Sequence, residues 1–141
     1  MPFQIPENLI FKNSRIRISC NISDNFNLTK KAIVIAGNKN GFLSLSNIIL
    51  YSSNMLEEQI KLKDISFVKS SIEVNIVINE DIENIHGYIS QISEIKYKWE
   101  LSEVNIDIVS GAIHSLGYIN NELHLDSGMS ESEISVYCVV D

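Results

Sequence analysis

The stretch Gly37–Leu56, GNKNGFLSLSNIILYSSNML, decides the fold, because it predicts a loop that runs into a largely covered helix over about residues 41–56. At 100° per residue its apolar side chains spread over roughly 220° of the helix surface. Asn38 or Asn40 is expected to cap the N-terminus by accepting from the first free N–H groups. The polar side chains left for the solvent side are Ser44, Asn47, Tyr51 and Asn54.

Strand patterns flank this unit on both sides. Residues 32–36 (AIVIA), directly before the loop, are apolar on both faces, which predicts a strand in a sheet covered on each side, or in the middle of a sheet against a helix. Residues 134–140 (ISVYCVV) predict a strand inside a sheet, because an exposed apolar edge would invite aggregation. Period-two alternation predicts further strands over residues 15–22, 59–63, 71–79, 95–101 and 122–126.

The region after residue 95 changes its pattern. Apolar side chains stand at 97, 99 and 101 and then at 104, 106 and 108, so the parity of the core-facing positions switches. Because successive strand residues point to opposite faces, this predicts strand residues on both sides of a bulge or loose turn at Ser102 and Glu103. Residues 109–119 fit helical spacing and predict a second helix, with a loop as the alternative because Gly111 and Gly117 each weaken a helix by ~1 kcal/mol.

These patterns predict one α+β domain over residues 1–141. A mainly antiparallel β-sheet packs on the central helix at about 41–56, and the second helix lies at about 109–119. The order strand, strand, helix, strand, strand can be drawn in each half of the chain, although the halves share almost no identities. Cys20 and Cys138 lie among strand residues and are interpreted as small core residues rather than as a disulfide.

Charge is divided unevenly along the 141 residues, whose net charge is −7. Residues 1–63 contain eight Lys and Arg against four Asp and Glu, whereas residues 64–141 contain three Lys against fourteen Asp and Glu. The second half is therefore expected to present an acidic face. Nucleic acid and anionic membranes are poor partners for such a face, because both are bound through Lys and Arg. With no apolar run of ~18 residues and no signal-peptide pattern, we expect a cytoplasmic protein.

The sequence carries no recognisable catalytic or metal-binding motif. His86, His114 and His124 lack paired-histidine spacing, and no CxxC or HExxH pattern occurs. We therefore expect no catalytic residue, no metal, no cofactor and no enzymatic activity. His124 and Asp126 would share one face of a strand, where a solvent-facing pair is favoured over a proton-transfer pair.

Three acids in four residues mark the segment before Gly87. Glu80, Asp81 and Glu83 repel one another and are followed by turn residues, which predicts an exposed loop. The segment lacks the alternating oxygen ligands and the glycine of a calcium-binding loop. The three carboxylates are interpreted as a solvated turn, with part of a partner-binding face as the alternative.

The segment from Gly37 to Ile78 resembles the small immunity proteins of bacterial polymorphic toxin and contact-dependent growth inhibition systems. Some of these carry a Gly-x-x-x-Gly-Leu-Leu-x-Leu helix followed by two strands, and the matching positions are Gly37, Gly41, Phe42, Leu43 and Leu45. Phe42 departs from the leucine, Lys61 replaces a histidine expected in the next strand, and residues 80–141 lie outside the resemblance. The resemblance implies a cytoplasmic antitoxin that binds a cognate toxin domain and blocks it.

The charge pattern fits such an antitoxin. Many of these toxins are nucleases and therefore basic, so an acidic inhibitor would dock on the basic cleft with salt-dependent association. Candidate contact residues are acids and tyrosines expected to be exposed: Glu80, Asp81, Glu83, Tyr88, Tyr118, Asp126, Glu131 and Glu133.

Two alternatives to the antitoxin stay open. A generic protein-binding or assembly module would show a symmetric apolar patch around a twofold axis. A small enzyme or ligand-binding protein using His114 or His124 would show a pocket with at least two convergent titratable groups. The oligomeric state does not follow from the sequence.

Overall fold

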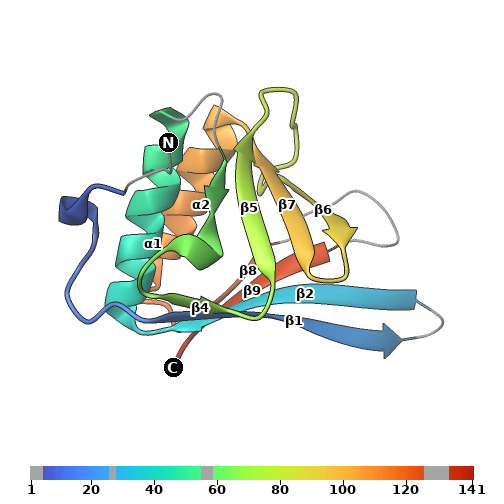
Figure 1. Ribbon diagram of the computed structural model, residues 1–141, viewed down its shortest axis with the longest axis horizontal. Helices are drawn as coiled ribbons and strands as arrows, with labels where there is room; N and C mark the ends of the chain where they lie inside the picture. The colour runs from blue at the N-terminus through green and yellow to red at the C-terminus, as the bar shows by residue number, and fades with distance from the viewer. Residues whose placement is uncertain (1–4, 26–27, 55–58, 126–133) are drawn as a thin grey trace.

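The computed structural model describes residues 5–25, 28–54, 59–125 and 134–141, and their arrangement is drawn in Figure 1. None of the helices in these ranges is long and apolar enough to cross a membrane. The helices are α1 (Lys39–Tyr51), α2 (Glu103–Ser115) and the short 3-10 helices η1 (Glu7–Leu9), η2 (Ser52–Asn54) and η3 (Leu62–Asp64). The strands are β1 (Ile16–Asn25), β2 (Leu28–Gly37), β3 (Ile60–Lys61), β4 (Val68–Ser70), β5 (Glu73–Ile78), β6 (Tyr88–Ser93), β7 (Lys96–Leu101), β8 (Glu122–Leu125) and β9 (Ile134–Val140).

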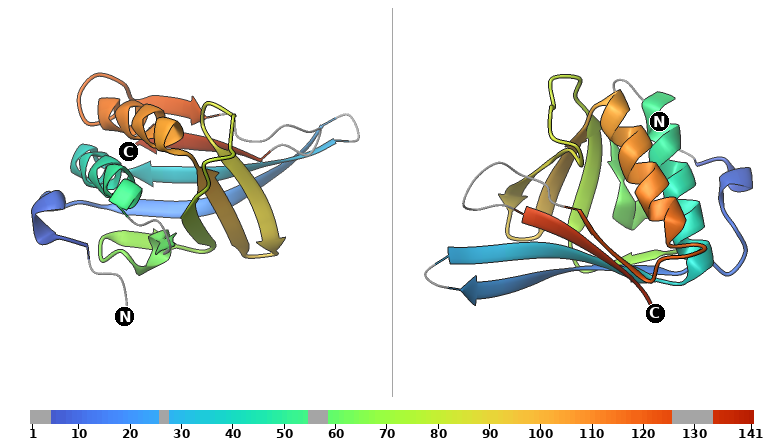
Figure 2. Two further views of the ribbon diagram at one scale, coloured as in Figure 1. Left: turned by 90° about the horizontal axis from the view of Figure 1, so that it is seen from above. Right: turned by 180° about the vertical axis from the view of Figure 1, so that it is seen from behind.

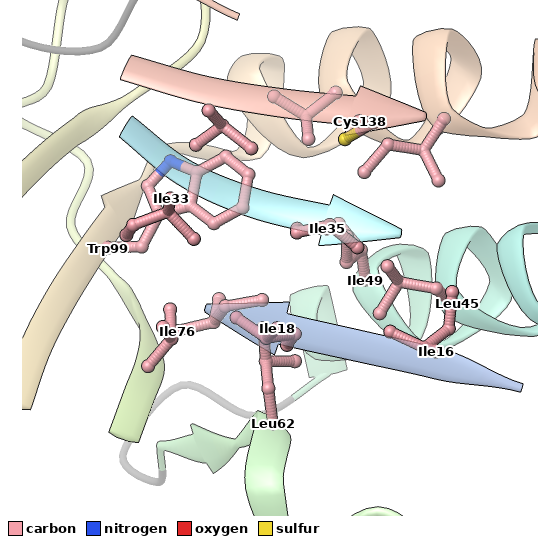
Figure 3. Packing of buried hydrophobic residues seen from close by; sticks show 14 of the residues in the cluster. Ile16, Ile18, Ile33, Ile35, Leu45, Ile49, Leu62, Ile76, Trp99 and Cys138 are labelled. Carbon is pink, nitrogen blue, oxygen red and sulfur yellow. The ribbon is translucent and has the colours of Figure 1, made fainter. Parts of the chain in front are cut away.

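Two mixed sheets and two helices enclose one hydrophobic core. The five-stranded sheet has the order β4-β1-β2-β9-β8, and the four-stranded sheet has the order β3-β5-β7-β6. The helices pack side by side in the angle between the sheets (Figures 1 and 2), and Figure 3 shows core side chains converging from both sheets and α1. Helix α2 adds Ile106, Val109 and Ile113 to the same core. Four strand pairs are antiparallel and three are parallel. The predicted α+β class is confirmed, with the pairing divided between two sheets.

The two halves of the chain have the same connectivity. The β1–β2 hairpin leads into α1 and then into β3 and β5, and the β6–β7 hairpin leads into α2 and then into β8 and β9. In each half both strands named after the helix lie in the other sheet, where β5 pairs parallel with β7 and β9 pairs parallel with β2. The residue after each of these two strands makes an equivalent hydrogen bond. Asn79 N, after β5, donates to Leu101 O of β7, and Asp141 N, after β9, donates to Gly37 O of β2, both at 2.9 Å. The predicted strand, strand, helix, strand, strand order is thus present twice, with β4 as an additional strand.

Helix α1 confirms the predicted central helix, with different ends. Asn38 is its N-cap, and the Asn38 side-chain oxygen accepts from Gly41 N at 2.7 Å. The α-helix ends at Tyr51 and continues as η2. The predicted solvent position of Ser44 is wrong, because the N-terminal arm covers it and Phe11 N donates to Ser44 Oγ at 2.8 Å.

Helix α2 begins directly after β7 because residues 102–105 form a capping box. Ser102 Oγ accepts from Asn105 N at 3.2 Å, and Asn105 Oδ1 accepts from Ser102 N at 2.9 Å. These two bonds satisfy backbone donors that a helix start would otherwise leave free. The switch in apolar parity is therefore the junction between a strand and a helix.

The predicted strand over residues 104–108, with its bulge or loose turn, is consequently wrong. Val104 and Ile108 lie on the solvent side of α2, while Ile106 and Val109 are buried, as 3.6 residues per turn requires. The second helix itself is confirmed, but it occupies Glu103–Ser115 instead of 109–119.

Most of the predicted strands are confirmed: those at residues 15–22, 32–36, 71–79, 95–101 and 122–126 correspond to β1, β2, β5, β7 and β8. The predicted strand over 59–63 is reduced to β3 followed by η3. Two edge strands, β4 and β6, were not predicted.

The two apolar strands of the five-stranded sheet, β2 and β9, lie inside the sheet. Strand β9 lies between β2 and β8, as predicted for a strand that is almost entirely apolar. Strand β2 buries Ile33 and Ile35 on its inner face, but Ala32, Val34 and Ala36 are only half-buried on the outer face. Both helices lie on the same side of the sheet, so β2 is not covered on its outer face. The alternative prediction fits, because β2 lies in the middle of the sheet and its inner face shares a core with α1.

Both cysteines are free thiols, and Cys138 belongs to the core as interpreted, whereas Cys20 is half-buried. Burial raises the pKa of the Cys138 thiol to about 12. Burial also raises the pKa of Tyr97 to about 12, helped by the Cys20 thiol, whose Sγ lies 3.3 Å from the Tyr97 hydroxyl. Both groups therefore stay neutral in the folded protein at pH values at which the unfolded chain ionises them.

The free energy of unfolding is expected to fall as the pH rises above about 9. A folded-state pKa above the unfolded value leaves stability intact below the unfolded value and removes it progressively towards about 12. For Cys138 alone the loss is about 2 kcal/mol at a pH of about 10.5. Guanidinium unfolding at neutral and alkaline pH measures it, and Cys138→Val should show a shallower decline than the wild type. Identical declines would contradict this explanation.

Candidate functional site

The acidic loop, residues 79–87, connects β5 to β6 and carries three exposed carboxylates. Glu80, Asp81 and Glu83 are all exposed, as the sequence predicts. The loop starts with an Asx turn, in which Asp81 N donates to the Asn79 side-chain oxygen at 3.0 Å. It ends at Gly87, which is buried and has a φ of +83°. Both ends are therefore fixed while the acids between them face solvent.

The backbone of the acidic loop is tied to the strand and helix beside it. Asn105 of α2 donates through Nδ2 to Asn84 O and to Ile85 O, the latter at 3.0 Å. Trp99 of β7 donates through Nε1 to His86 O at 2.9 Å. These hydrogen bonds are accepted by backbone carbonyls of the loop and do not involve its carboxylates. They hold the loop, and with it the three acids, at a defined position next to the start of α2.

Helix α2 adds two exposed acids at the same end of the molecule. At 100° per residue, Glu103 and Asp107 lie on the flank of α2 that also carries Ser110, whose hydroxyl donates to Ser46 O of α1 at 3.0 Å. Asn105, which holds the acidic loop, lies on the opposite flank. Neither the acidic loop nor α2 contains Lys or Arg. We call the five carboxylates the acidic end: Glu80, Asp81, Glu83, Glu103 and Asp107.

Acids elsewhere in the second half are paired with cations from distant parts of the chain. Asp141 bonds to Arg15 Nη2 at 2.9 Å and to Arg17 Nη2 at 2.8 Å. These two hydrogen bonds hold the pKa of Asp141 below its usual value. The pairing joins the last described residue to β1 and the turn before it.

Two acids of the four-stranded sheet are paired as well. Glu73 lies 3.6 Å from Lys63 Nζ and 3.5 Å from Lys96 Nζ. Glu100 lies 3.3 Å from Lys98 Nζ. These acids are neutralised locally and add little to the acidic face expected of the second half, whereas the acidic end keeps five exposed carboxylates for which the described residues show no ion pair.

The structure brings together only some of the predicted contact residues. Tyr88 follows the acidic loop directly and is 36% exposed. Tyr118 is exposed but lies in the turn beyond the other end of α2. Sequence reasoning missed Glu103 and Asp107, because it placed them in or beside a strand. The remaining predicted residues, Asp126, Glu131 and Glu133, lie outside the described residues.

The three histidines do not converge. His86 belongs to the acidic loop, the ring of His114 lies 5.1 Å from that of Tyr118, and the ring of His124 lies 4.5 Å from that of Tyr137. In the described ranges, no group of three or more His, Cys, Asp or Glu side chains is placed to hold a metal ion. The predicted neighbour of His124, Asp126, is outside these ranges.

Two surface depressions accompany the sheets. One, of about 210 Å³, is lined by Lys63, Glu73 and Lys96 together with serine hydroxyls, and its charges already pair with one another. The other, of about 600 Å³, is an open depression over β4, β1 and β2, whose outer face carries Arg17 and Lys69. No histidine lines either depression.

Comparisons of the chain with family models, with curated proteins and with solved structures found no match.

Proposed function

We propose that this chain is a cytoplasmic bacterial immunity protein that binds a cognate basic toxin domain, of the nuclease type, through the acidic loop and blocks it. One observation carries the proposal: five exposed carboxylates gather at one end of the molecule, in segments that contain no Lys or Arg, whereas Glu73, Glu100 and Asp141 are paired with cations. The resemblance of residues 37–78 to small immunity proteins supports the same function. Such a protein acts by binding, not by catalysis.

The anatomy of this end suits a charged interface. Ile85, which is 63% exposed, and Tyr88 offer apolar contact area beside the carboxylates of the acidic loop. Interfaces of this kind combine a few apolar or aromatic anchors with a charged rim. Glu103 and Asp107 add to the negative potential that would steer a basic partner, and the association rate would fall with added salt.

Charge reversal in the acidic loop tests the proposal. The chain is co-expressed with the C-terminal domain of the effector encoded beside it, and the pair is analysed by size-exclusion chromatography and titration calorimetry at low and high salt. The triple variant Glu80→Lys, Asp81→Lys, Glu83→Lys is expected to weaken the complex at least about 100-fold, because each reversal replaces attraction with repulsion.

The matched control changes the same number of charges elsewhere. Glu7, Asp64 and Glu94 are exposed and lie outside the acidic end, so their replacement by Lys shifts the net charge equally. This control should weaken binding by no more than about tenfold, through the long-range field alone. Failure of the wild type to co-elute at any salt concentration would refute the antitoxin function, and equal losses in both triple variants would refute the role of the acidic loop.

A further inference from the structure

Helix α2 turns an apolar stripe towards solvent. Val104 is 67% exposed, Ile108 is 37% exposed, and Tyr118, in the turn that follows the helix, is 63% exposed. At 100° per residue Val104 and Ile108 point roughly away from the buried residues of α2. Figure 2 shows α2 at the outside of the molecule in the view from behind. A contiguous exposed apolar stripe on a helix is typical of a contact surface.

Gly111 stands in the middle of this stripe, at an exposed position of α2. No atom lies within 4 Å of the position that a Cβ atom would occupy there. At Gly41, by contrast, a Cβ would lie 2.5 Å from Arg15 O, so that glycine is needed for packing. Glycine is among the poorest residues for a helix interior. Its presence at an open position of α2 is explained if another backbone approaches the helix at this point.

The spacing of the stripe is symmetric about Gly111. Val104 precedes Gly111 by seven residues, about 10 Å along the helix, and Tyr118 follows it by seven residues, in the turn after the helix ends. We propose that a second copy of this chain docks on this face, so that two α2 helices cross in antiparallel orientation with the twofold axis at Gly111. Val104 then meets Tyr118 of the second copy, and Ile108 meets His114 of the second copy. A twofold interface of this kind is self-complementary.

The distribution of charge favours the antiparallel pairing. The acids of α2, Glu103 and Asp107, lie at its N-terminal end, whereas residues 108–121 contain no acid. The twofold axis therefore sets Glu103 and Asp107 of each copy against the part of the other copy's α2 that carries no acid, and keeps these like charges apart. Antiparallel helix dipoles are also favourable. The two acidic loops remain at opposite ends of the dimer, so this assembly does not depend on the proposed antitoxin function.

Sedimentation velocity over a range of about 1 to 200 μM tests the dimer, since a single helix pair is a small interface and predicts weak association. Val104→Asp, which introduces a charge into the stripe, is expected to raise the dimer dissociation constant at least about tenfold. Ile95→Asp is the matched control, because Ile95 is 63% exposed in the turn between β6 and β7. A wild type that stays monomeric throughout, or a dimer that both variants weaken equally, would overturn the proposal.

Cysteine cross-linking tests the position of the axis. Helix axes about 8–10 Å apart place facing Cα atoms roughly 3.5–5.5 Å apart, which overlaps the span of a disulfide. Gly111→Cys should therefore give a covalent dimer under mild oxidation. Asp107→Cys, one turn away, would place the two sulfurs more than about 10 Å apart along the helices and should not. Equal cross-linking of both variants would place the axis elsewhere and overturn the proposal.

Gly111→Ala separates the effect of this position on helix stability from its effect on dimer association. The added methyl group should raise the melting temperature of the monomer, because alanine favours the helix and meets no atom within 4 Å. The same methyl group should raise the dimer dissociation constant several-fold, because it holds the two helices apart. A variant that gains stability and keeps the wild-type association would show that no backbone approaches Gly111.

Discussion

Trp99→Ala is expected to lower the free energy of unfolding by about 3–5 kcal/mol, a large part of the stability of a domain of this size. Trp99 is fully buried on β7 and is the largest of the buried side chains. Figure 3 shows it among core residues contributed by both sheets. Its removal leaves a cavity that the paired strands around it cannot close, and it also deprives His86 O of its donor.

Far-UV circular dichroism during guanidinium unfolding measures this loss, because Trp99 is the only tryptophan and its fluorescence disappears with it. Trp99→Phe is the control, since it keeps most of the ring volume and loses only the indole N–H. Trp99→Phe should lower the free energy of unfolding by less than half as much as Trp99→Ala does. If the two variants were equally unstable, the hydrogen bond to His86 O would matter more than packing, and cavity formation would not be the main cause of the loss.

Periodicity in the sequence predicts helices and strands that have one side in the core and the other side towards solvent. In β7 every second residue enters the core, and Tyr97 and Trp99 accordingly mark this strand in the sequence. In α1 the apolar surface is wide because sheets and α2 surround most of it. Such elements can be recognised from the sequence because burial follows the local geometry of the backbone.

The start of α2 could not be recognised in this way. Val104, Ile106 and Ile108 alternate like a strand, yet Val104 and Ile108 are exposed and only Ile106 enters the core. The residues that mark the start of the helix are Ser102 and Asn105, which form the capping box. Over the same residues the apolar alternation indicates a strand, so the two sequence patterns conflict. The two acids that complete the acidic end were missed for this reason, since a strand would have put them elsewhere.

The pairing of distant segments depends on tertiary structure and leaves no local trace. The parallel crossings of β5 to β7 and of β9 to β2 join strands from different halves of the chain. They also bring Arg15 and Arg17 to Asp141, which is why the charge division along the sequence overstates the acidity of the surface. The acidic loop was predictable because its three carboxylates are adjacent in sequence and their exposure follows from local turn chemistry.

Gly87→Ala is expected to lower the free energy of unfolding by about 2–4 kcal/mol. The backbone of Gly87 has a φ of +83°, which residues with a Cβ rarely adopt. A Cβ at this position would also lie 2.5 Å from Glu100 O, 2.5 Å from Leu101 Cδ2 and 3.0 Å from Trp99 Nε1. The matched control is Gly111→Ala, which meets no atom and should raise stability by up to about 1 kcal/mol. Guanidinium unfolding of both variants measures the difference.

The same substitution separates the charge of the acidic loop from its position. Gly87 fixes the loop end that Trp99 holds through His86 O, so an added methyl group displaces the loop without changing any carboxylate. Under conditions in which Gly87→Ala remains folded, its affinity for a basic toxin domain should fall by about tenfold, while the salt dependence stays close to that of the wild type because the number of charges is unchanged. An affinity equal to that of the wild type would mean that the acids act through the long-range field, independently of the geometry that Gly87 maintains.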